Sequence, residues 1–239
     1  MKNLKTSVLG LCTLMLLSGC SNMTNTTKGG IIGGAGGAAL GGLIGQIIGK
    51  DTKGTVIGAA IGTAVGTTAG VLIGKKMDKA KAAAEAVENA QVESITDANG
   101  LQAVKVTFDS GILFPTGSSA LQASAKKSLS EFANVLISNA DADVAIKGYT
   151  DNAGWKNSTP EQSIIKNQNL SLQRAQSVQN YLTSNGVSYS QIKTVEGLGE
   201  ANPVADNSTA AGKAQNRRVE VYLYASKQMI EAANNGTLK

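Results

Sequence analysis

The sequence predicts an α/β fold in the C-terminal half of the 239-residue chain, a βαβαββ sandwich whose mixed sheet carries its helices on one face. Two patterns predict this fold. Apolar residues alternate in short stretches, as in strands, and recur at helical spacing in two longer stretches. The expected strands are residues 101–108, 144–148, 192–197 and 218–224, and the expected helices are residues 119–138 and 170–184. About 125 residues suffice to bury one core.

Local signals support the individual elements in chain order. The first strand, LQAVKVTF, alternates apolar and polar residues, and residues 109–117 contain two Gly and one Pro, which favours a loop. The second helix stops at Asn185-Gly186, a pair typical of a helix C-terminus. The last strand, RVEVYLY, alternates most cleanly of all. The folded domain is therefore expected at residues 101–226.

Residues 1–19 have the features of an export signal, because two Lys residues precede a short apolar run that ends in Leu17-Ser18-Gly19-Cys20. This ending resembles a bacterial lipobox. The resemblance implies cleavage before Cys20, acylation of Cys20 and a polar lipidated tether at residues 20–28. It also implies anchoring in outer-membrane lipid, because Ser21 is typical of lipoproteins sorted there, with the folded domain in the periplasm.

Residues 29–74 form a glycine repeat that holds 16 of the 28 glycine residues. Every fourth residue is Gly in two arms, at 33–49 and 54–74, separated by the polar tetrapeptide KDTK. Gly at this spacing lets two helices pack closely in an apolar setting, and each arm approaches the length that crosses a bilayer core. We expect a glycine-zipper helical hairpin, with its depth in the membrane left open. A flexible linker is the alternative.

Residues 75–100 are predicted to be a solvated helical linker. Strong helix formers, charges of both signs and many Ala residues fill positions 75–94. Residues 227–239 are predicted to be a fraying C-terminal helix or tail.

Four motifs follow one another in the predicted domain: TDNAG at 150–154, NxxLSxxRA at 167–175, GLGE with a following Asn-Pro at 197–203, and NRRVE at 216–220. In this order they resemble the OmpA-like domain, which binds peptidoglycan, over residues 103–225. With the lipobox and the glycine arms upstream, the layout is similar to that of outer-membrane lipoproteins of the YiaD type.

The resemblance implies a site for the meso-diaminopimelate of the peptidoglycan stem peptide, whose side chain ends in an ammonium and a carboxylate on one carbon. Asp151 matches the family's acceptor of the ammonium, and Arg174 matches the Arg that binds the carboxylate, a pairing that can be bidentate. A helix N-terminus near Asn167 would favour the same carboxylate. The other implied contacts are Asn167, Arg217 and the backbone N–H groups around Thr116 and Gly117.

Structural roles are the alternative for the same residues. Without the motifs, Asp151 is a turn residue and Arg174 is half of an ion pair, while Arg218 is expected as a charge on the sheet face or edge. Residues 155–166 also separate the first two motifs by more than is usual in the family. Thr159-Pro160-Glu161 predicts a helix start there, and the single Trp, Trp155, either extends the binding surface or packs the longer helix. We favour packing.

The composition excludes several classes of function. Without His there is no Ser-His-Asp triad and no His-ligated metal, and two Cys cannot form an all-cysteine zinc site, so no metal and no cofactor is expected. The net charge of +5 comes without a basic cluster, so nucleic-acid binding is not expected. Homo-oligomers remain open.

Three functions compete on these grounds. The leading hypothesis is a non-enzymatic tether that joins the outer membrane to peptidoglycan. The second is a cell-wall hydrolase with Asp151 and Glu161 as paired carboxylates, which would have to lie about 5–10 Å apart. The third is a pore-former or assembly factor that acts through residues 29–74.

Overall fold

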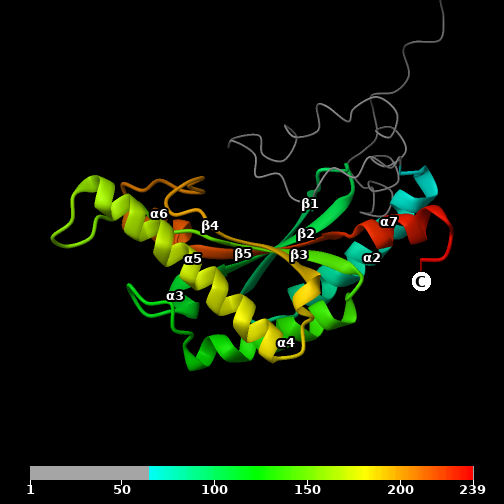
Figure 1. Cartoon of the computed structure of the whole chain (residues 1–239), viewed down its shortest axis with the longest axis horizontal. Coiled ribbons are helices and arrows are strands. Elements are labelled where there is room, and N and C mark those ends of the chain that lie inside the picture. The colour runs from blue at the N-terminus through cyan, green and yellow to red at the C-terminus, as the bar shows by residue number, and fades with distance from the viewer. Residues whose placement is uncertain (1–64, 239) are drawn as a thin grey trace, which may run out of the picture.

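A computed structural model describes residues 65–238, which form one five-stranded sheet covered by helices (Figure 1). The sheet order is β1-β2-β5-β3-β4, and only the β3–β4 pair is parallel. The strands are β1 (Ala90–Thr96), β2 (Gln102–Asp109), β3 (Ala142–Gly148), β4 (Ile192–Gly197) and β5 (Arg218–Ala225). The helices are α2 (Thr67–Glu85), α3 (Ser110–Leu113), α4 (Ala123–Ser138), α5 (Pro160–Ser184), α6 (Ala210–Asn216) and α7 (Lys227–Asn234), with a 3-10 turn η2 (Tyr189–Gln191). The predicted α/β sandwich with a mixed sheet is confirmed.

The core lies between one face of the sheet and the helices α2, α4, α5 and α7. Alternate residues of the central strands point into it, among them Phe108 of β2 and Val221 of β5. Phe108 meets Phe132 of α4 edge to face, with ring centroids 5.5 Å apart. On the other face of β5, Arg218 donates to Glu220 over 2.7 Å, as expected for a charge on the sheet face.

Two glycine residues bring α5 close to the sheet, which positions the candidate site. A Cβ at Gly148, the last residue of β3, would lie 2.1 Å from the Ser171 carbonyl oxygen. A Cβ at Gly197, the last residue of β4, would lie 2.2 Å from the Leu172 nitrogen. The middle of α5 therefore lies directly against the ends of both strands.

The prediction of a solvated linker at residues 75–94 is wrong. Helix α2 buries one side against the sheet, with Ile73, Met77 and Ala80 each at most 1% exposed. After it, β1 pairs antiparallel with β2 and forms an edge of the sheet. The small Ala residues, which suggested a solvated helix, instead allow α2 to lie close to the sheet. The strand β1 was missed because a half-exposed edge strand shows little apolar alternation.

Part of the predicted glycine hairpin also belongs to the folded domain. Helix α2 begins at Thr67, inside the second glycine arm, and both Gly70 and Gly74 are buried in it. Within residues 65–238, no helix is both long enough and apolar enough to span a membrane. The export signal, Cys20 and the glycine repeat before residue 65 lie outside the described residues, so the structure does not test the predictions made for them.

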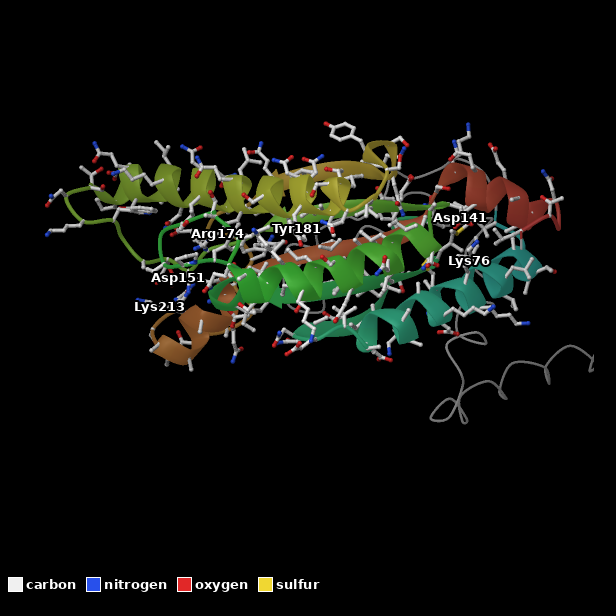
Figure 2. All side chains as sticks on the ribbon, turned by 90° about the horizontal axis from the view of Figure 1, so that it is seen from below. Lys76, Asp141, Asp151, Arg174, Tyr181 and Lys213 are labelled. Atoms are coloured by element: carbon white, nitrogen blue, oxygen red, sulfur yellow. The ribbon has the colours of Figure 1, made fainter. Side chains whose placement is uncertain are left out.

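The C-terminal segment forms the helix α7 but does not fray from the domain as predicted, because α7 packs into the core through Met229, Ile230 and Ala233. Ser226 caps the helix by accepting from the Met229 N–H over 3.0 Å. Figure 2 shows a second link at this end of the molecule, where Lys76 of α2 lies beside Asp141 and forms an ion pair with it. Helices α2 and α7 thus close the end of the domain opposite Asp151 and Arg174 (Figure 2).

Candidate binding site

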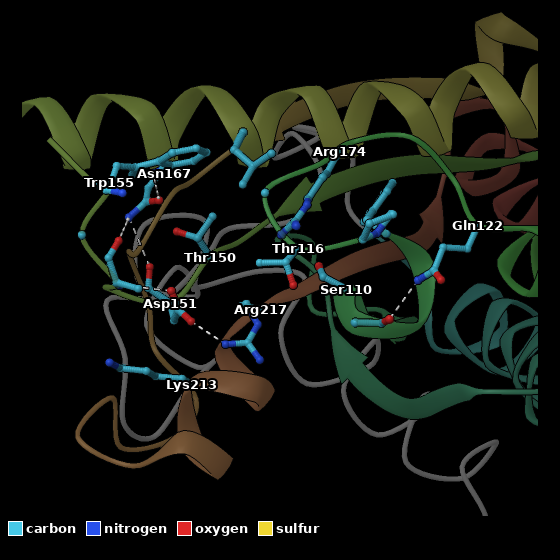
Figure 3. Close-up of a pocket in the computed structure, with 18 residues that line it drawn as sticks. Ser110, Thr116, Gln122, Thr150, Asp151, Trp155, Asn167, Arg174, Lys213 and Arg217 are labelled. Carbon is cyan, nitrogen blue, oxygen red and sulfur yellow. Dashed lines mark hydrogen bonds and ion pairs between the residues drawn. The ribbon is translucent and has the colours of Figure 1, made fainter. Parts of the chain in front are cut away.

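A cavity of about 660 Å³ lies beyond the carboxyl end of β3, between α3, α5 and α6 (Figure 3). The loop after α3 and the loop after β3 complete its wall. All six residues implied by the sequence motifs line this one cavity: Thr116, Gly117, Asp151, Asn167, Arg174 and Arg217. The fold therefore brings together residues that are spread over about a hundred positions, although their role as ligand contacts stays a prediction.

Asp151 is held at the mouth of β3 by two hydrogen bonds. Its Oδ1 accepts from the Ala153 N–H over 3.0 Å, which is the short-range geometry of an Asx turn. Its Oδ2 accepts from Arg217 Nη1 over 2.5 Å, and Figure 3 shows this ion pair on the cavity wall. Each carboxylate oxygen can accept a second bond, so the pair with Arg217 leaves Asp151 able to bind an ammonium group.

Arg174 is a buried cation without a carboxylate partner. Its side chain comes from the middle of α5, and the residue is 3% exposed. The Nε donates to the Ser118 carbonyl over 3.0 Å, and the guanidinium lies 5.2 Å from the Phe114 ring centroid. Among residues 65–238 it forms no ion pair, so the expectation of a structural ion pair is not met.

The positive charge of Arg174 therefore has no carboxylate in an ion pair with it among residues 65–238. Burial lowers the pKa of the Arg174 guanidinium, the nearby positive charge of Arg217 lowers it further, and Asp151 offsets part of the effect. An Arg remains protonated at neutral pH in spite of such a shift. Because a buried charge without a counter-ion is costly, an anion in the cavity would be stabilised strongly.

Asn167 of α5 stabilises the cavity wall through side-chain hydrogen bonds. Its Nδ2 donates to the Ala153 carbonyl over 3.1 Å, and its Oδ1 accepts from Trp155 Nε1 over 2.7 Å. The expectation of a helix N-terminus near Asn167 is wrong, because α5 begins at Pro160, two turns earlier. Asn167 therefore positions the loop that carries Asp151, and no helix end directs its dipole at the cavity there.

The predicted helix start in the long insertion is confirmed. Thr159 and Gln162 form a reciprocal capping box, with Pro160 as the first helical residue. The packing role favoured for Trp155 is confirmed, whereas a role in binding stays a prediction. Its backbone N–H donates to Ser163 Oγ over 3.0 Å, which packs the insertion onto α5, and its indole also lines the cavity.

The sequence analysis did not assign several further lining residues to the site, among them Ser110, Thr150, Lys156 and Lys213. Ser110 and Thr150 are 1% and 4% exposed, and neither hydroxyl has a hydrogen-bond partner in the part of the chain that the structure describes. Lys156 and Lys213 add positive charge to the wall. Thr150 could have been found beside Asp151 in the TDNAG motif, whereas Ser110 and Lys213 lie on the short helices α3 and α6, in segments that the sequence left as loops.

Asp151 and Glu161 do not form a hydrolase pair. Glu161 lies at the exposed start of α5 and does not line the cavity. Hydrogen bonds from its own backbone N–H and from Thr159 lower the pKa of its carboxyl group, whereas a catalytic acid needs a raised one.

Comparison with known proteins agrees with this arrangement. Residues 113–217 match the model of the OmpA family, and residues 1–78 match the YMGG-like Gly-zipper. Residues 113–217 are thus similar to a domain of the OmpA family, and the segment before them is similar to a glycine zipper.

Among individual relatives, "Probable lipoprotein YiaD" of Escherichia coli (strain K12) is 41% identical over 118 residues, which are 49% of this chain and 50% of that protein. "Peptidoglycan-binding protein ArfA" of Mycobacterium bovis is 45% identical over 93 residues, 39% of this chain and 26% of that protein. The chain therefore spans no more than half the length of either relative. The crystal structure of a putative MotB-like protein from Desulfovibrio vulgaris shares the fold, with a TM-score of 0.53 and 23% identity over 65% of this chain and 94% of that one.

Proposed function

We propose that this protein binds peptidoglycan non-covalently through the diaminopimelate of the stem peptide, while acyl chains on Cys20 hold it in the outer membrane. The observation that carries the proposal is that Asp151 and Arg174 line one cavity and are not paired with each other. A carboxylate and a guanidinium on one wall match the ammonium and the carboxylate at the end of diaminopimelate.

The electrostatics of the wall favour this ligand over a simple cation or a neutral sugar. Arg174 offers its remaining N–H groups to a carboxylate in a buried place, where charge-assisted bonds are strongest. Asp151 accepts an ammonium beside Arg217, so one side chain of the protein holds each charge of the zwitterion. The ArfA relative, whose name states that it binds peptidoglycan, supports the same assignment.

Co-sedimentation with purified sacculi tests the proposal. We expect the mature protein to sediment with walls that contain diaminopimelate, and to bind more weakly to walls that contain lysine, because lysine lacks the side-chain carboxylate. Arg174→Gln and Asp151→Asn should each reduce binding by at least about tenfold, since each removes a charge-assisted contact of about 1.5–3 kcal/mol.

Glu161→Gln is the matched control, because it neutralises an exposed carboxylate at the start of α5 that does not line the cavity. It should bind as the unmodified protein does. Equal sedimentation of all four proteins would contradict the proposal, provided that circular dichroism shows each variant to be folded.

A further inference from the structure

The cavity has an excess of positive charge that a single zwitterionic group would not neutralise. Four cationic side chains line it, Lys156, Arg174, Lys213 and Arg217, against one carboxylate, Asp151. Asp151 already pairs with Arg217 over 2.5 Å. A ligand end with one ammonium and one carboxylate adds no net charge, so it leaves the excess of positive charge as large as before.

Two of these cations remain unused by the proposed contacts. Arg174 is assigned to the ligand carboxylate and Arg217 to Asp151, which leaves Lys156 and Lys213. Neither Lys forms an ion pair within residues 65–238. Lys156 lies next to Trp155 on the loop after β3, and Figure 3 shows Lys213 of α6 beside Asp151, on the side away from Trp155. The two Lys residues thus line the cavity from two different segments, the loop after β3 and the helix α6.

Buried hydroxyl groups in the same cavity point to a further acceptor. Ser110 Oγ and Thr150 Oγ1 are buried, line the cavity and lack a hydrogen-bond partner among the described residues. A buried hydroxyl without a partner is costly, and an oxygen-rich anion would accept a hydrogen bond from it. The wall therefore offers both the charge and the neutral donors for a second anionic group.

We infer that Lys156 and Lys213 bind a second free carboxylate of the same stem peptide, and that the protein prefers peptides in which this group is not amidated. The inference rests on the proposed function, since it assumes that the diaminopimelate end occupies Asp151 and Arg174. A carboxylate can pair with both amines, whereas a carboxamide is neutral and gains none of that attraction. The stem peptide has two sources of such a group, the α-carboxylate of D-glutamate and the terminal carboxylate of D-alanine.

Titration with soluble peptides tests the inference. The reference ligand is the tetrapeptide L-Ala-γ-D-Glu-meso-diaminopimelate-D-Ala. One amidated ligand carries D-isoglutamine in place of D-Glu, and another carries a D-alanine amide. We expect amidation at the relevant position to weaken binding to the unmodified protein by about fivefold, the upper range for a partly exposed ion pair. The fluorescence of Trp155, the single Trp, and titration calorimetry both report binding.

The double variant K156Q/K213Q should bind all three peptides with the weaker affinity, so that the preference disappears. Its matched control is K127Q/K227Q, which removes the same charge from Lys residues whose side chains are 68% and 65% exposed and do not line the cavity. The control should keep the preference.

The outcomes separate this inference from the proposed function. If the unmodified protein binds the three peptides equally tightly, or if K156Q/K213Q keeps the preference, the second carboxylate site is overturned and diaminopimelate binding stands. If K156Q/K213Q binds all three peptides more weakly by the same factor, the Lys residues contact another group. The inference is then also overturned. If the unmodified protein binds none of the peptides, both proposals fail.

Discussion

At the scale of single residues, Arg174 and Asp97 show opposite ways to bury a charge. Arg174 stays positive without a counter-ion beside an open cavity, which makes it a place for an anion. Asp97 lies fully buried in the turn between β1 and β2, where it accepts from the Asn99 and Leu101 N–H groups over 2.8 and 2.9 Å. Burial outweighs these bonds and raises the pKa of Asp97 to about 6.

This raised pKa predicts how stability depends on pH. Between about pH 4 and 6 the folded protein keeps a proton on Asp97 that the unfolded chain releases, so this residue's contribution to stability falls as pH rises through that window. The loss reaches about 3 kcal/mol above the folded-state pKa. Asp97→Asn keeps the Oδ1 acceptor and cannot ionise. It should therefore be more stable than the unmodified protein at about pH 8 and similar at about pH 4.

Urea unfolding of both proteins at these two pH values measures the effect. A constant difference in the free energy of unfolding between the two proteins at both pH values would show that Asp97 does not titrate on unfolding.

At the scale of elements, α2 is part of the domain rather than a spacer before it. Met77 is 1% exposed, although its neighbours on the outer side of the helix are solvated. Met77→Ala should lower the free energy of unfolding by about 2–4 kcal/mol, because it leaves a cavity in the core. Lys79→Ala on the exposed side should change it by less than about 0.5 kcal/mol. Thermal or urea unfolding measures both, and similar small effects would restore the spacer interpretation.

Helix α5 shows how one element serves both stability and binding. Its middle lies against Gly148 and Gly197, which fixes the position of Arg174. Its first two turns come from the insertion, and Asn167, which follows them, is hydrogen-bonded to Ala153 and Trp155 in the loop that carries Asp151. Both residues proposed to hold the zwitterion are therefore placed by the same helix.

At the scale of the whole molecule, the chain enters the domain at one end and the cavity lies at the other (Figures 1 and 2). The Gly66 N–H donates to Asn234 Oδ1 over 3.2 Å, so the start of α2 is attached to α7 as the chain enters. This arrangement fits the proposed tether, because the start of α2 and the cavity lie at opposite ends of the domain.

The proposed lipid anchor makes a prediction at this scale. The unmodified protein should fractionate with the outer membrane, and Cys20→Ala should move it out of that fraction, because the variant has no acyl chain to bury in lipid. Cell fractionation followed by immunoblotting measures this. Sacculus binding by the purified variant should be unchanged, and unaltered fractionation would contradict acylation at Cys20.

The sequence by itself determined the strands β2, β3, β4 and β5, the helices of the α4 and α5 regions, and the motifs that contain Asp151, Asn167, Arg174 and Arg217. These depend on local periodicity and short motifs, which a single sequence displays. Only the tertiary structure decided that α2, β1 and α7 join the domain, and that Ser110, Thr150, Lys156 and Lys213 meet at one cavity. The reason is physical: a pattern shows that a face is apolar or a side chain charged, but which surface covers that face, and which charges meet, is set by the packing of distant segments.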